Sequence, residues 1–189
     1  NGGTLTAEKT SLMMGWDSAA TFEATAGTAK LKGIRFSTAR GNEDSLILGS
    51  AESGSARINL GSAGISGIGT NDKVLLGNGI IGATSDFSIT GSGSVAMVAT
   101  KGSTVFDTDG HKITVSTALT GDGNITKLGE GTLLISGSGS AYAGNIAVNA
   151  GALAVDATGK DILTSAASVA VGDGATLDLS ALNFTDTSH

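Results

Sequence analysis

Short apolar runs separated by turn residues follow one another along the whole chain. Gly, Asn, Asp and Ser lie between the runs, as is typical of strands joined by tight turns. A helical apolar period is not sustained, because glycine interrupts nearly every window of eleven residues. We therefore predict an all-β chain with strands at Thr21–Ala24, Lys30–Phe36, Ser45–Leu48, Ala56–Leu60, Lys73–Leu76, Asp86–Thr90, Ser94–Ala99, Thr104–Phe106, Lys112–Val115, Asn124–Lys127, Thr132–Ser136, Asn145–Val148, Ala152–Val155, Ser168–Val171 and Thr176–Leu179.

A repeat emerges when glycine-led segments are aligned on their first large apolar residue. The aligned segments are 102–106, 131–135, 151–155 and 174–179. Leu133 and Leu153 are 20 positions apart, and Leu153 and Leu177 are 24 apart. A period of this size predicts a β-solenoid, in which coils of about 20 residues stack and the chain makes about nine of them. The part up to Phe36 is the least regular.

Composition narrows the possible functions. The 189 residues include no Cys, which excludes disulfides and thiol chemistry and is compatible with export. The net charge is −6 and the few Lys and Arg are scattered, so we expect no nucleic-acid partner. The sequence contains no run of about 18 apolar residues, so no transmembrane helix is predicted. Because the chain starts at Asn1 without a signal segment, we expect it to be a piece of a longer precursor.

The stretch GDGNITKLGEGTLLISG (121–137), followed by YAGNIAVNAGAL (142–153), resembles the autotransporter-associated β-strand repeat, also called the passenger-associated transport repeat. The similarity is strongest over 121–155, and weaker matches extend it to about 33–180. Asn124 departs from the family pattern, in which a second glycine is common, and Ser140-Ala141 replaces the usual Asn-Thr. The matching positions, to which we assign structural roles, are Gly121, Gly123, Thr126, Lys127, Gly129, Gly131, Thr132, Leu133, Ile135, Ser136, Gly137, Tyr142, Gly144, Gly151 and Leu153.

The resemblance implies a right-handed parallel β-helix in the passenger of a type V secreted protein from a Gram-negative bacterium. It implies that residues 1–189 form a single passenger fragment at the cell surface or secreted. The partner in the precursor would be the protein's own C-terminal outer-membrane barrel. We expect that translocator to be absent here, since no amphipathic membrane strands follow Ser180.

The most suggestive candidate chemistry lies in VFDTDGH (105–111). Phe106-Asp107-Thr108 resembles the start of an aspartic protease motif, in which two carboxylates share a proton, and Asp186 offers a second Asp-Thr. Asp109 stands where that motif needs glycine. Asp107 and Asp109 also resemble the start of a calcium loop, but the remaining ligands of such a loop are missing. We favour the simpler interpretation, an Asp-Gly turn between two coils.

Other motifs are weaker. Gly77–Gly82 fits a dinucleotide-binding glycine pattern, but the strand predicted after it replaces the helix that such a site needs, so we interpret it as a turn. His111 and His189 form no zinc motif. Trp16 is the only tryptophan, and we expect it to cap the open end of the core rather than to stack on a sugar. No cofactor or metal is expected.

Two hypotheses of function follow. The first is a structural and interaction module, a β-helical stalk or adhesin that supports secretion and display, with host glycan or matrix protein as candidate partners and self-association through exposed end coils. The alternative is a hydrolase, either an acid-type aspartic peptidase or a glycan-cleaving β-helix, that acts on extracellular host or matrix polymers through Asp107, Asp109 or Asp186.

Overall fold

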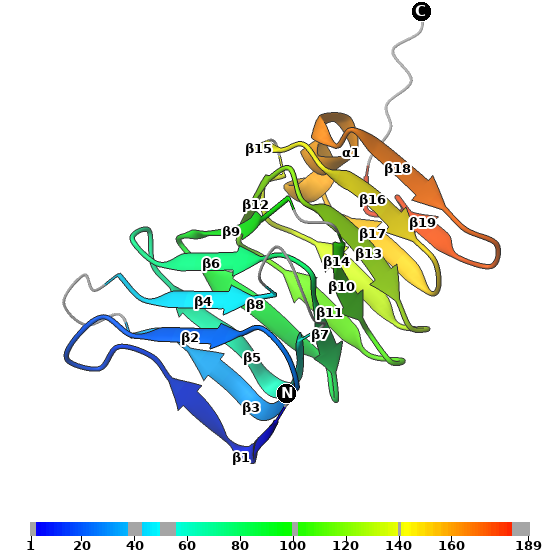
Figure 1. Cartoon of the computed structure of the whole chain (residues 1–189). Coiled ribbons are helices and arrows are strands. Elements are labelled where there is room, and N and C mark those ends of the chain that lie inside the picture. Colours follow the sequence, from blue (N-terminus) through cyan, green and yellow to red (C-terminus); the bar gives the residue numbers. More distant parts are fainter. Residues whose placement is uncertain (1–2, 38–42, 50–55, 100–101, 140, 183–189) are drawn as a thin grey trace, which may run out of the picture.

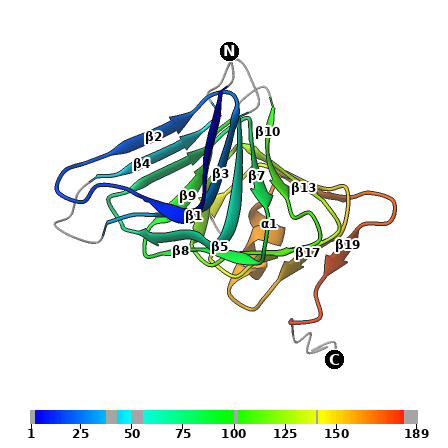
Figure 2. The same ribbon diagram turned by 90° about the horizontal axis from the view of Figure 1, so that it is seen from below.

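The chain folds into a parallel β-solenoid of about seven turns, as a computed structural model shows, and this confirms the predicted fold class. The structure describes residues 3–37, 43–49, 56–99, 102–139 and 141–182. Every strand pair in this part is parallel, and the coils stack from β1 at one end to β18 and β19 at the other (Figure 1 and Figure 2).

Three faces make up each complete coil. The first face holds β7 (Gly79–Ala83), β10 (Ser103–Asp107), β13 (Asn124–Leu128), β16 (Asn145–Val148) and β18 (Ser168–Val171). The second holds β8 (Phe87–Gly91), β11 (Lys112–Val115), β14 (Thr132–Ile135), β17 (Ala152–Val155) and β19 (Thr176–Asp178). The third holds β2 (Thr21–Ala24), β4 (Ser45–Leu48), β6 (Lys73–Leu76), β9 (Ser94–Met97), β12 (Ala118–Gly121) and β15 (Ala141–Tyr142).

Three long strands join the first two faces at the N-terminal end. They are β1 (Thr4–Met13), β3 (Thr28–Arg35) and β5 (Ala56–Ile68). The first half of β5 pairs with β7 and its second half with β8, and the registers of the long strands shift between these halves. Each long strand therefore bends around the corner that two separate strands occupy in the later coils.

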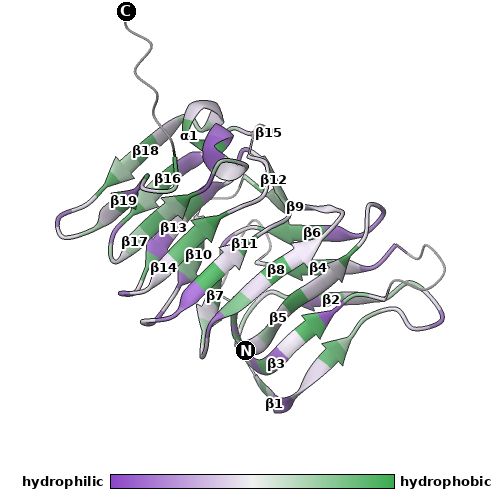
Figure 3. Cartoon of the chain, turned by 180° about the vertical axis from the view of Figure 1, so that it is seen from behind, coloured by the Kyte–Doolittle hydropathy of each residue, from purple (hydrophilic) through white to green (hydrophobic). Residues whose placement is uncertain are grey.

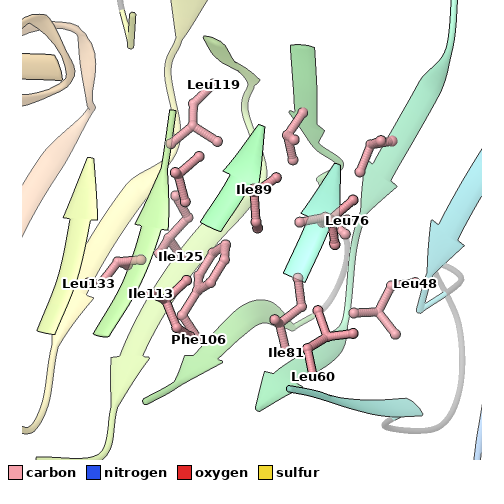
Figure 4. Close-up of a cluster of buried hydrophobic side chains, with 14 of the residues drawn as sticks. Leu48, Leu60, Leu76, Ile81, Ile89, Phe106, Ile113, Leu119, Ile125 and Leu133 are labelled. Carbon is pink, nitrogen blue, oxygen red and sulfur yellow. The ribbon is translucent and has the colours of Figure 1, made fainter. Parts of the chain in front are cut away.

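Side chains that point inward form columns along the solenoid axis. Residues alternate between buried and more exposed in most strands, which is the period that a half-buried strand requires. Hydrophobic and more polar residues alternate along the same strands (Figure 3). Leu133 pairs with Leu153 and Leu153 with Leu177, as the repeat predicts. Phe106, Ile113, Ile125 and Leu133 reach the same interior from different faces (Figure 4).

The number of coils was overestimated, because the N-terminal coils are longer than the repeat from which it was derived. Val105 and Thr126 are paired, which gives a coil of 21 residues, whereas the pairing of Thr28 with Arg57 gives 29. One alignment was also wrong. The segment 102–106 pairs through β10 with β13 on the first face, whereas 131–135 forms β14 on the second.

Several elements went unrecognised in the sequence. Every predicted run overlaps a strand, but β1, β7, β12 and β15 were missed. The segment Gly77–Gly82 is not simply a turn, since Gly79–Ala83 is the buried strand β7. A 3-10 turn, η1 (Gly159–Asp161), and one helical turn, α1 (Ile162–Ser165), stand next to β15 on the third face (Figure 1). Buried Ile162 explains the helical turn, because it covers the core where the next strand of the third face would lie.

The prediction for Trp16 was wrong. Its side chain is 70% exposed, whereas Met14 is 2% exposed and belongs to the core. Gly15, between them, has a positive φ of 58°. The chain thus turns Met14 inward and leaves Trp16 in solvent at this end of the solenoid.

Candidate functional site

Asp107, the main candidate for catalysis, is held in an ion pair on the outside of the first face. Its Oδ2 accepts a hydrogen bond from Nη2 of Arg57 at 2.8 Å, and Arg57 Nε donates to Asn59 Oδ1 at 2.6 Å. In register, Gly82 lies between Asn59 and Asp107, and a Cβ there would collide with the Arg57 guanidinium. The glycine therefore opens the space through which Arg57 spans from β5 to β10.

The Asp-Gly turn is present, although it joins two faces of one coil rather than two coils. Asp109 and Gly110 both have positive φ, 45° and 83°, and His111 N donates to Thr108 O at 2.7 Å. Thr108 is buried and its hydroxyl donates to Leu128 O in the next coil at 3.1 Å. Thr108 and Asp109 therefore form the corner between β10 and β11.

The predicted carboxylates do not assemble a site in the described residues. Asp107 is paired with Arg57, and Asp109 is exposed at the tip of the turn. Asp186, the other candidate, lies outside the described residues. Nor does any group of three His, Cys, Asp or Glu side chains suited to a metal ion occur within that part of the chain. Neither the hydrolase nor the calcium hypothesis therefore gains support from Asp107 and Asp109.

Lys127 is the residue whose environment the sequence analysis missed. It sits in an inward column between Phe106 and Val148 and is fully buried. Its Nζ donates to the carbonyl oxygens of Leu128, Gly129 and Ala150 at 2.9, 2.7 and 3.0 Å, so one ammonium binds two successive coils. The sequence held one signal of this burial, because Lys127 occupies an inward position whose neighbours in the adjacent coils, Phe106 and Val148, are apolar.

The electrostatics of Lys127 follow from this position. Burial lowers its pKa from 10.5 to about 8, while attraction by Asp107 and Glu130 acts in the opposite direction. The side chain is still mostly protonated at neutral pH and can supply all three hydrogen bonds. Its contacts are all with main-chain carbonyls of the protein, which is the arrangement of a structural cap rather than of a nucleophile.

Other residues of the repeat motif also bond main-chain or side-chain groups, Tyr142 within its own coil and Ser136 in the next coil. Tyr142 is buried, and its hydroxyl donates to Asn145 O at 2.9 Å, while burial raises its pKa. The Ser136 hydroxyl donates to Asp156, whose carboxylate also accepts the backbone N–H groups of Thr158 and Gly159. These bonds lower the pKa of Asp156 and hold the chain as it enters η1.

Glycine is required where corners of adjacent coils touch. Gly131 lies against His111 of the preceding coil, and a Cβ on Gly131 would overlap the carbonyl oxygen of His111. Gly129 has φ of 78°, in the left-handed region that side chains disfavour. The glycine-rich motif therefore reflects close backbone approach between coils.

A second buried polar arrangement lies in the N-terminal coils. Asp44 is fully buried, and its Oδ1 accepts the N–H of Ala20 at 2.8 Å. The backbone N–H of Asp44 in turn donates to Asp72 Oδ1 at 3.0 Å, and Asp72 Oδ2 accepts the N–H of Gly69 at 2.7 Å. Carboxylates therefore bind the main chain at the corner that leads into the third face.

A polar hollow of about 300 Å³ lies on the outside of the second face. Its lining includes the hydroxyl-bearing residues Ser62, Ser66, Ser88, Thr90 and Thr114, together with Asp86 and Lys112. Asp86 Oδ1 accepts the backbone N–H of Lys112 at 2.9 Å and lies 3.6 Å from His111 Nδ1.

The outer surface of the first face differs, because its polar side chains bond one another. Ser103 and Thr126 share a hydrogen bond of 2.8 Å, Asn145 donates to Asn124 at 3.0 Å, and Ser168 donates to Asn145 at 2.8 Å. In contrast, the side chains of Ser66, Ser88, Thr90 and Thr114 make no hydrogen bond to another group within the described part of the chain. The hollow therefore offers a polar ligand hydroxyl groups that are not already bonded to other protein groups.

No helix in the described ranges has the length and apolar character needed to cross a membrane. A scan against protein-family models finds no match, and searches of curated proteins and of solved structures find none either. The fold and the chain's own contacts are therefore the basis for the functional argument.

Proposed function

We propose that this chain is a structural and interaction module of a surface-exposed autotransporter passenger, a β-helical stalk or adhesin that supports secretion and display. One observation carries the proposal: parallel ladders run through about seven turns, and the buried ammonium of Lys127 in the repeat motif also bonds a carbonyl of the next coil. The resemblance of residues 121–155 to the passenger-associated transport repeat supplies the secretion part of the proposal.

The contacts suit a chain that folds after crossing a membrane. Each coil pairs only with the coils before and after it, so the stack grows without long-range pairing between its ends. The absence of Cys removes the risk of cross-linking on the way. In the precursor, the chain's own outer-membrane barrel is the proposed partner, and the proposed location is the extracellular side of the outer membrane.

A display experiment tests this function. The chain is placed between a signal peptide and an outer-membrane barrel translocator, and antibody binding and protease resistance are measured on intact cells. We expect a displayed, protease-resistant wild type, and we expect Gly131→Val to lose resistance because its side chain collides with His111. Equal protease sensitivity of the two chains at the surface would argue against a folded display module.

The polar hollow on the second face is the proposed adhesive surface, with host glycan or matrix protein as its partner. Ser88 and Thr114 are paired in register, so their hydroxyls come from adjacent coils and present donors and acceptors to a polyhydroxylated ligand. Binding to arrayed glycans and matrix proteins is compared for the wild type and the Ser88→Ala/Thr114→Val variant. A matched control is Thr126→Val on the first face. Equal binding by all three proteins would exclude the hollow.

A further inference from the structure

Two Asp-Gly pairs lie at corners inside the stack, where coils flank each of them on both sides. Asp109 and Gly110 form the turn between β10 and β11, and Asp122 and Gly123 connect β12 to β13. Both aspartates are exposed, but Gly110 is exposed as well, whereas Gly123 is buried. The same dipeptide therefore occurs in two different backbone environments.

An Asp-Gly pair can react with itself. The backbone nitrogen of the glycine attacks Cγ of the protonated aspartate, the N–Cγ bond forms, and the carboxyl hydroxyl leaves with the amide proton as water. The product is a cyclic succinimide, which water reopens at either carbonyl. Opening at Cγ restores aspartate, and opening at the main-chain carbonyl gives isoaspartate, whose chain runs through the side-chain carbon. Glycine permits the attack because it has no Cβ in the way.

The peptide of Gly110 has room for this reaction. Ring closure requires rotation about the Cα–C bond of Asp109, which carries the Gly110 N–H with it. Beyond the chain neighbours, no atom lies within 4 Å of the position that a Cβ on Gly110 would take. The Gly110 N–H makes no hydrogen bond within the described part of the chain. The bond that has to open is the turn's own, from His111 N to Thr108 O at 2.7 Å.

The peptide of Gly123, in contrast, is held from both sides. Its N–H donates to Met97 O in the preceding coil at 3.0 Å. A Cβ on Gly123 would collide with Val98 O, and a Cβ on Gly144 of the next coil would collide with Gly123 O. Rotation toward a succinimide at Asp122 would therefore break a bond between coils and drive the peptide into a neighbouring backbone.

The corner at Asp109 can also accommodate the product. Thr108 N and the Thr108 hydroxyl donate to Leu128 O at 3.0 and 3.1 Å, and Thr132 N donates to His111 O at 3.0 Å. These bonds fix both ends of the turn to the next coil without involving Asp109 or Gly110. The methylene that isoaspartate adds to the main chain would therefore lie at the tip, where the space is open.

We propose that Asp109 is a site of isoaspartate formation and that the fold protects Asp122 from the same reaction. The reaction uses the chain's own atoms and water, and it changes neither the mass nor the net charge. It differs between the two pairs because the glycine nitrogen can move at one corner and not at the other. This inference does not depend on secretion or display.

Peptide mapping of the aged protein tests the proposal. The native chain, and the chain unfolded in guanidinium chloride, are incubated at neutral pH until the unfolded chain contains isoaspartate at both sites. Trypsin places the two pairs in different peptides, 102–112 and 113–127, and electron-transfer fragmentation locates isoaspartate within each. In the native chain, conversion at Asp109 should be at least about tenfold faster than at Asp122, because opening the Gly123 corner separates packed coils. In the unfolded chain the two rates should agree within about twofold.

Two matched variants complete the test. Asp109→Glu should abolish conversion in peptide 102–112, because the extra methylene enlarges the ring that would have to form. Asp122→Glu is the control and should leave that conversion unchanged, and circular dichroism should show that both variants keep the β fold. Equal native rates at Asp109 and Asp122 would overturn the proposal. So would an absence of conversion at Asp109 in the native chain, or conversion in peptide 102–112 that persists in Asp109→Glu.

Discussion

The N-terminal coils, β1 to β9, and the C-terminal coils, β10 to β19, use the same parallel stacking, but the fully buried charged residue at a corner is an acid in the first and a base in the second. In the N-terminal coils Asp44 and Asp72 accept backbone N–H groups. In the C-terminal coils Lys127 and Tyr142 donate to backbone carbonyls. Coil length also differs, since 29 residues separate Thr28 from Arg57 and 21 separate Val105 from Thr126.

This difference shows what makes a solenoid repeat regular. Both kinds of coil need glycine where backbones touch, as at Gly64 and Gly131, and the short coils add a buried donor, Lys127, for carbonyls that turn inward. A longer coil can bend a strand around a corner, as β5 does, and its sequence then departs from any short motif. We expect glycine corners to be sensitive to substitution in both regions, and the C-terminal coils to depend on Lys127 as well.

The largest expected effect is at a glycine corner. Gly131→Ala places a Cβ inside contact distance of the His111 carbonyl and should lower the free energy of unfolding by about 3 kcal/mol or more. Gly61→Ala, in β5, meets nothing closer than 3.4 Å and should change it by less than about 0.5 kcal/mol. Urea denaturation measures both variants. Equal losses would mean that backbone contact at the corner does not decide the cost of the substitution.

A second pair of variants examines the N-terminal coils alone. Met14→Ala removes a buried side chain and should cost about 2–4 kcal/mol, because it leaves a cavity. Trp16→Ala removes a side chain that is 70% exposed and should cost less than about 0.5 kcal/mol. Thermal unfolding followed by circular dichroism distinguishes them. A larger loss for Trp16→Ala would restore its assignment as the cap of the core.

The next largest loss of stability is expected from replacing Lys127, whose ammonium is buried. Lys127→Met keeps a long apolar stem but removes the ammonium donor of the Gly129 and Ala150 carbonyls, while Leu128 O keeps its bonds from Thr108, and should cost about 2 kcal/mol. The cost of burying the charge in the wild type offsets part of the loss. Lys30→Met, at an exposed position of β3, is the control and should be nearly neutral. Denaturant midpoints at pH 7 give the comparison, and an equal shift for both variants would deny Lys127 its capping role.

The same lysine predicts a pH dependence. Its folded-state pKa of about 8 lies below the unfolded value of 10.5, so between these values the unfolded chain binds more protons. Wild-type stability should therefore rise from pH 8 to pH 10.5 relative to Lys127→Met, by up to about 1.4 kcal/mol per pH unit. Parallel urea titrations of both proteins measure the difference. If the stability of the wild type relative to Lys127→Met stays constant or falls as the pH rises, the ammonium remains charged in the folded state.

The smallest effect is expected at the ion pair that links the two regions. Arg57 and Asp107 are 31% and 24% exposed, so Asp107→Asn should cost less than about 1 kcal/mol, and less still at high salt. Asp109→Asn, at the exposed turn, is the matched control. Urea denaturation at low and high salt tests the expectation. A cost that does not depend on salt would point to hydrogen bonding rather than charge.

The pattern along the chain was sufficient for the class of fold, because a period-2 alternation interrupted by turn residues is a local property. It located strands such as β14 and β17 and aligned Leu133, Leu153 and Leu177 correctly, since coils of similar length keep equivalent residues at similar spacings. The turn at Asp109 and Gly110 followed from residue type alone.

Other features depended on contacts between residues distant in the chain. Whether Asp107 is free or paired depends on Arg57, which reaches it only across Gly82 in the stack. The burial of Lys127 depends on carbonyls contributed by two coils, and the exposure of Trp16 on how Gly15 turns the chain. Pairing register and side-chain reach between coils are three-dimensional quantities, so local patterns cannot determine them, and that is why the strands were found while the partners of their polar groups were not.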